Sequence, residues 1–126
     1  MNKLIDAWDE YKKAKHLLTV TLPVTNDPKL LLGVLENIHN SMQSSIDVQK
    51  ELGLVLKSDV MKAFQEVKEI VMSHKRSPVE FKRKDKFIIC SSDYLMKEVS
   101  VPKVKRLLNS NYALLHDVVA VLNRKE

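Results

Sequence analysis

The sequence predicts an all-α protein, a four-helix bundle with a short irregular or β-hairpin insertion between its third and fourth helices. Four stretches of the chain repeat apolar residues every three or four positions, which is the spacing of helices that bury one face. The whole chain has only two glycines and four prolines, too few turn-forming residues for a fold of many short strands. With 126 residues, 44% of them hydrophobic, the chain is expected to form a single helical domain, residues 1–126, with an ordinary core.

The first helix is expected from about Lys3 to Thr21. Its apolar face includes Trp8 and Tyr11, which we interpret as core anchors in preference to a platform for a ligand. Pro23 is expected to end this helix or to lie just beyond its end, because proline has no N–H to donate and its ring collides with the preceding turn.

The second helix is expected to begin at Asn26-Asp27-Pro28, where either polar residue can cap it and proline occupies the first turn. It continues to about Leu52, and Gly53 is placed to terminate it. At 1.5 Å per residue the helix is roughly 37 Å long. Its second half is less apolar than its first, so we expect that half to be less fully covered within one chain.

The third helix is expected from about Asp59 to His74, with Ser58 as its cap. Ser77-Pro78-Val79-Glu80 has the pattern of a further helix start, which would open only a short turn. Residues 86–99 then combine β-prone side chains with a turn-like Ser91-Ser92-Asp93. This composition predicts a small hairpin or an extended excursion.

The last helix is expected to start at Ser100-Val101-Pro102 and to continue to about Asn123. Its apolar face is broad, and Asn111 lies in the same seam as the leucines and valines. A helix that is apolar over most of its circumference is either central to the bundle or shared with a second subunit. We therefore expect a homodimer, formed through the exposed half of the second helix or the broad face of the last one.

Almost all of the excess positive charge lies in one segment, residues 75–86. The chain has 21 basic and 16 acidic residues, and this segment contains six of the former and two of the latter. Its cations are predicted to contact the phosphates of RNA or another polyanion, with Phe81 and Phe87 available to stack on bases. The alternative is a solvated connector whose apolar residues turn inward. The predicted nucleic-acid-binding residues are Lys75, Arg76, Lys82, Arg83, Lys84 and Lys86.

No catalytic, metal or cofactor site is predicted. Glu36-Asn37-Ile38-His39 has the Glu-x-x-His spacing of di-iron bundles, but such a site needs two of these motifs and no second one exists. We interpret His39 instead as part of a solvated or interfacial polar face. Cys90, the single cysteine, lies in an apolar run where a thiol is usually inert. No apolar run approaches the ~20 residues that span a bilayer, so the protein is expected to be cytoplasmic and to have no membrane partner.

In helix number and length the chain resembles the HEPN class of helical bundles. Active members of that class are dimeric RNases that carry an arginine, four to six further residues and then a histidine. Arg106 precedes His116 by ten positions, about 15 Å along one helix, which departs from that motif. The other arginines have no histidine at the required distance: Arg76, Arg83 and Arg124. The segment from Ser77 to Lys84 also resembles one found in small uncharacterised archaeal helical proteins, which brings no known activity with it.

The favoured function is a non-enzymatic binding module that contacts RNA or another polyanion through the basic segment. Two alternatives stay open. One is a structural or protein-interaction subunit that acts through apolar helix faces. The other is a divergent HEPN-like RNase that uses His39 or His116.

Overall fold

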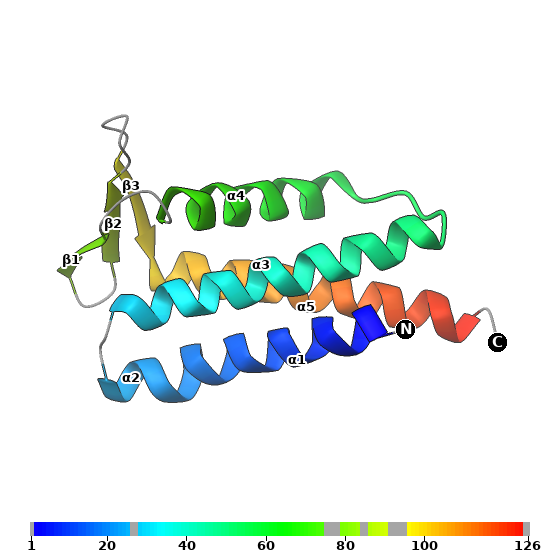
Figure 1. Cartoon of the computed structure of the whole chain (residues 1–126), viewed down its shortest axis with the longest axis horizontal. Coiled ribbons are helices and arrows are strands. Elements are labelled where there is room, and N and C mark those ends of the chain that lie inside the picture. The colour runs from blue at the N-terminus through cyan, green and yellow to red at the C-terminus, as the bar shows by residue number, and fades with distance from the viewer. Residues whose placement is uncertain (1, 26–27, 75–78, 84–85, 91–95, 125–126) are drawn as a thin grey trace.

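The computed structural model describes residues 2–25, 28–74, 79–83, 86–90 and 96–124 of the chain. Four long helices form an up-and-down bundle, shown in Figure 1. They are α1 (Asn2–His16), α3 (Pro28–Glu51), α4 (Ser58–His74) and α5 (Val101–Arg124). Helices α3 and α5 pack against each other, and each also packs against α1 and α4. The prediction of an all-α bundle with four main helices is confirmed.

The first helical rod is longer than predicted and changes its pitch just before Pro23. Helix α1 continues as a π-helical turn, η1 (Leu17–Thr21), and as the short helix α2 (Leu22–Thr25). The Leu22 N–H donates to the carbonyl of Leu17, one residue further back than in an α-helix. The prediction that Pro23 ends the helix or lies just beyond its end is therefore wrong, because α2 includes Pro23 and continues to Thr25. The wider turn shifts the hydrogen-bond register next to a residue that cannot donate, so the helix continues past the proline.

Helix α3 ends in the glycine-containing turn that the sequence predicts. Gly53 has a φ of 72°, in the left-handed region that glycine adopts without steric cost. Its N–H donates to the carbonyl of Lys50 at 3.0 Å, and the Leu54 N–H donates to the carbonyl of Gln49 at 2.9 Å. These two bonds satisfy carbonyls that the helix itself leaves open, and they fix the direction of the connector to α4.

The start of α4 differs by one residue from the prediction, whereas α5 starts where it was predicted. The Met61 N–H donates to the carbonyl of Lys57 at 3.1 Å, so Lys57 occupies the N-cap that was predicted for Ser58. Helix α5 starts where the sequence predicts, and Ser100 caps it. The Lys103 N–H donates to the side-chain oxygen of Ser100 at 3.2 Å, which satisfies one open donor of the first turn.

Short strands lie between α4 and α5, at one end of the bundle (Figure 1). They are β1 (Val79–Arg83), β2 (Lys86–Cys90) and β3 (Met96–Ser100), which form an antiparallel sheet in the order β1-β2-β3. The hairpin predicted over residues 86–99 coincides in position with β2 and β3, and its turn lies outside the described residues. The helical turn predicted from Ser77 is not formed where the chain is described, because Val79–Arg83 is extended.

The core is centred on α3 and α5, whose inward residues follow the predicted spacing. Ile38 of α3 and Leu115 of α5 are fully buried, and so are residues one turn from them on the same inward faces: Leu35, Met42 and Val118. The second half of α3 was expected to be less covered, and this is wrong: Met42, Ile46 and Val48 are all buried within one chain. Helices α1, α4 and α5 surround α3 along its length, so the more polar second half is covered as well. None of the described helices is long and apolar enough to span a membrane.

Hydrogen bonds between buried polar groups cross the middle of this core. The Ser41 Oγ donates to the carbonyl of Ala7 at 2.7 Å and accepts from the Asn111 Nδ2 at 2.9 Å. The Ser45 Oγ donates to the carbonyl of Ser41 at 2.9 Å. All three side chains are fully buried. The polar residues that interrupt the apolar seams of α3 and α5 are thus used to connect α1, α3 and α5.

Candidate nucleic-acid interface

Aromatic side chains of α1 and α5 meet where these two helices pack together. Trp8 lies edge-on to Tyr112, with 6.2 Å between the ring centroids. Tyr11 contacts both rings, at 5.9 Å from Trp8 and 5.6 Å from Tyr112, and Tyr112 is also in contact with His116 at 6.2 Å. Tyr11 is buried and Trp8 is half-buried, whereas Tyr112 is 46% exposed and His116 is exposed. The cluster therefore begins in the core and ends at the surface.

Tyr11 and Trp8 are core anchors, as predicted, but Trp8 also borders the surface. Tyr11 belongs to the buried core, and the ring of Trp8 packs against that core from its edge. Burial raises the pKa of the Tyr11 phenol, and the neighbouring phenol of Tyr112 raises it further. The buried phenol of Tyr11 therefore stays uncharged at neutral pH. Its ring packs against the more exposed rings of Trp8 and Tyr112 and holds them in place.

Lysines extend from this cluster along both helices. Lys12 and Lys15 follow Trp8 by four and seven positions, which places them on the same face of α1. Lys105 precedes Tyr112 by seven positions and shares its face of α5. All three lysines are exposed. Because α1 and α5 run in opposite directions (Figure 1), Lys15 and Lys105 both lie toward the end of the bundle that carries the strands.

We call this surface the aromatic–lysine face. Its residues are Trp8, Lys12, Lys15, Lys105, Tyr112 and His116. The nearby carboxylates lie elsewhere. Asp6, Asp9 and Glu10 of α1 line a hollow shared with α3, and Asp117 of α5 forms an ion pair with Lys57 at 3.3 Å. The hollow toward α3 thus holds these three carboxylates of α1 together with Lys13, which pairs with Glu10.

The residues of the predicted basic segment lie largely outside what the structure describes. Lys75, Arg76 and Lys84 are outside the described residues, and of the rest only the backbone is described. Arg83 of β1 is the register partner of Lys86 of β2, so these two positions are neighbours in the sheet. Binding by the six cations together therefore stays a prediction.

The two histidines considered for catalysis have different surroundings. His39 of α3 is half-buried and stacks on Phe64 of α4, with centroids 5.4 Å apart and planes 17° apart. The sequence predicted a solvated or interfacial polar face for it, and in the structure its ring packs against a neighbouring helix. His116 lies at the exposed end of the aromatic cluster, beside Tyr112. Within the described ranges, no three acidic, histidine or cysteine side chains lie close enough to hold a metal ion.

Sequence reasoning did not single out the aromatic–lysine face. Two signals for it were present in the sequence: the spacing of Lys12 and Lys15 from Trp8, and that of Lys105 and His116 from Tyr112. Each set marks one helical face. What the sequence could not supply was the packing of α1 beside α5, which makes the two faces one surface.

Comparison with known proteins adds no family assignment. No protein-family model matches the chain, and no curated protein is significantly similar to it. No solved structure is significantly similar either. The resemblance to HEPN bundles therefore stays a prediction, and the function is inferred from the site alone.

Proposed function

We propose that the protein is a non-enzymatic module that binds single-stranded RNA on its aromatic–lysine face. The observation that carries this proposal is the contact between Trp8 and Tyr112, on a surface where three exposed lysines share their helix faces. Proteins that bind single strands without reading their sequence combine aromatic rings, on which bases stack, with cations that attract the phosphates.

The composition of the face indicates binding with little sequence preference. Its cations are lysines, which act as point charges, and it has no arginine for bidentate contacts to a base edge. Stacking contributes roughly 1–3 kcal/mol for each base that an aromatic ring holds. Contact between three lysines and three phosphates predicts a slope of about −2 in a plot of log K against log salt concentration.

The basic segment fits the same proposal as an extension of this surface. Strands β1 and β2 lie at the end of the bundle toward which Lys15 and Lys105 extend (Figure 1). A strand of RNA that continues from the aromatic–lysine face toward this end would meet the segment that carries most of the excess charge. Engagement of four to six further cations would steepen the salt slope to roughly −5 or −6.

The test is fluorescence anisotropy of a labelled oligouridylate of roughly twelve nucleotides, a length that matches known single-strand sites. The variant Lys12→Gln, Lys15→Gln, Lys105→Gln is compared with the control Lys50→Gln, Lys62→Gln, Lys68→Gln. The control removes the same charge from exposed positions on α3 and α4. We expect the first variant to bind at least tenfold more weakly and the control to bind almost as tightly as the wild type.

Two results would count against the proposal. Equal weakening in both variants would mean that net charge alone attracts the oligonucleotide. Wild-type affinity that does not change between low and moderate salt would mean that phosphate contacts contribute nothing. A third variant, Lys82→Gln, Arg83→Gln, Lys86→Gln, measures the share of the basic segment separately, because these positions lie outside the aromatic–lysine face.

A further inference from the structure

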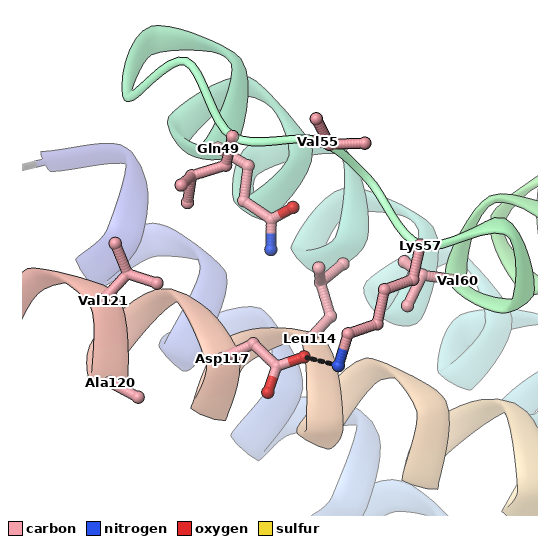
Figure 2. A pocket seen from close by; sticks show the side chains of 9 residues that line it. Gln49, Val55, Lys57, Val60, Leu114, Asp117, Ala120 and Val121 are labelled. Carbon is pink, nitrogen blue, oxygen red and sulfur yellow. Dashed lines mark hydrogen bonds and ion pairs between the residues drawn. The ribbon is translucent and has the colours of Figure 1, made fainter.

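A recess lies between the end of α3, the α3–α4 connector, the start of α4, and α5 (Figure 2). The connector is at the end of the bundle opposite the strands (Figure 1). Its volume is about 280 Å³. Six of its nine lining residues are apolar: Leu54, Val55, Val60, Leu114, Ala120 and Val121. Three polar side chains also line it: Gln49, Lys57 and Asp117.

Gln49 is the residue that distinguishes this recess from a simple surface hollow. The residue is only 6% exposed, and Figure 2 shows its carboxamide pointing into the space above Leu114. Among the described residues, no protein group forms a hydrogen bond with this carboxamide. A carboxamide offers two N–H donors and a carbonyl acceptor, and the polar atoms of this one stay accessible from the recess that it faces. The group is therefore placed to bind something that enters the recess.

A backbone hydrogen bond fixes the position of Gln49 in the lining of the recess. The Gln49 carbonyl accepts the Leu54 N–H at 2.9 Å, in the turn that Gly53 makes possible. The connector residues that line the recess leave directly from this turn. The position of the carboxamide is thus set by a regular helix end, which is the kind of element that holds a binding group precisely.

An ion pair borders the recess on the side opposite Gln49. The Lys57 Nζ lies 3.3 Å from the Asp117 Oδ2, and Figure 2 shows this contact spanning from the connector to α5. Lys57 and Asp117 are the charged residues in the lining and their charges are opposite, so the recess offers a charged ligand no net attraction. The recess therefore favours an uncharged ligand that leaves the pair intact.

We propose that this recess binds a small neutral molecule whose cyclic amide edge pairs with the carboxamide of Gln49. A cyclic amide has its N–H and C=O side by side, so it can accept from and donate to the carboxamide at the same time. The apolar residues around it, with Leu114 below, cover a ring of hydrocarbon character. The volume is near the lower end of ligand pockets, which fits a single ring. This proposal is independent of RNA binding.

The test uses ε-caprolactam as the probe and N-methylcaprolactam as its matched control, which lacks the N–H. Each is titrated into the ¹⁵N-labelled full chain, and NMR shifts are followed at the Gln49 side-chain amide and at the backbone amides of Val55 and Val121. We expect saturable shifts with the lactam and roughly tenfold weaker binding of the N-methyl compound, the scale of one lost hydrogen bond.

Three variants separate a specific site from a water-filled hollow. Gln49→Leu should weaken lactam binding about tenfold, and Ala120→Leu should abolish it by filling the recess without touching the carboxamide. Gln43→Leu, a change of the same kind elsewhere on α3, should leave binding unchanged. Absence of saturable shifts, equal binding of both compounds, or unchanged lactam binding in Gln49→Leu and Ala120→Leu would each overturn the proposal.

Discussion

Asn111 of α5 donates a hydrogen bond to the Oγ of Ser41 on α3, at 2.9 Å, in a part of the core where both side chains are fully buried. Ser41 in turn donates to the carbonyl of Ala7 on α1. Each bond requires its two helices to lie at one particular height relative to each other. A slip of either helix by one turn would leave buried polar groups without partners, which is more costly than a shift within an apolar seam. The pair thus specifies how α1, α3 and α5 are aligned.

Asn111→Ala should lower the free energy of unfolding by about 2–3 kcal/mol, because it leaves a cavity and removes a buried hydrogen bond. Asn111→Leu should cost less than about 1 kcal/mol. It fills the same volume and removes the Asn111 Oδ1, a buried oxygen with no hydrogen-bond partner among the described residues. Denaturant unfolding of the two variants measures both values. If Asn111→Leu destabilised the protein as much as Asn111→Ala, the Asn111 amide would contribute to stability itself, in addition to aligning the helices.

Substitution of the two glycines should change stability in opposite directions. Gly53→Ala should destabilise the protein by roughly 1 kcal/mol, because φ is 72° and the surrounding space is open, so that only the backbone conformation is strained. Gly33→Ala should stabilise it by about 0.5–1 kcal/mol, since the residue is inside a helix and its Cβ would lie 3.7 Å from Leu17 Cδ1, an ordinary contact. Thermal unfolding of both variants measures the two changes in stability. A stabilising Gly53→Ala would contradict the claim that this turn requires a left-handed backbone at residue 53.

The buried phenol of Tyr11 predicts sensitivity to alkaline pH. Burial raises its pKa above the ordinary value for tyrosine, and the neighbouring Tyr112 raises that pKa further. The folded protein therefore disfavours the phenolate, and the stability that the neutral phenol contributes is present below the unfolded pKa and is lost as the pH rises through the folded one. Tyr11→Phe should reduce the loss of unfolding free energy between about pH 8 and pH 11. A loss as large as in the wild type would assign the alkaline transition to other groups.

The helices were predictable because each depends on a local pattern. The apolar spacing, the Ser100 cap and the Gly53 turn are readable along the chain, and so is the interruption at Asn111. The π-helical turn was not, because the sequence around Pro23 does not show that the helix can shift register and continue. The apolar spacing identifies which face of a helix is buried. Which element packs against that face depends on the tertiary structure.

The sites were less predictable for the same reason. The sequence indicates that Gln49 and Asp117 are polar residues on their helices, but not that the α3–α4 connector folds over both of them. Likewise the second half of α3 has a polar sequence and yet is covered by its neighbours. This removes one of the two surfaces expected to form a homodimer. The dimer itself stays a prediction that sedimentation or light scattering can test.

The measurement that tests the proposed function most directly uses Trp8, the single tryptophan of the chain, as its own probe. If bases stack on the aromatic–lysine face, titration with an oligouridylate should quench Trp8 emission in a saturable manner. The slope of log K against log salt concentration should be about −2 or steeper. The Lys12→Gln, Lys15→Gln, Lys105→Gln variant should lose the quenching of Trp8 emission. Binding detected by anisotropy with no change in Trp8 emission would contradict the account, because it would place the RNA on another surface.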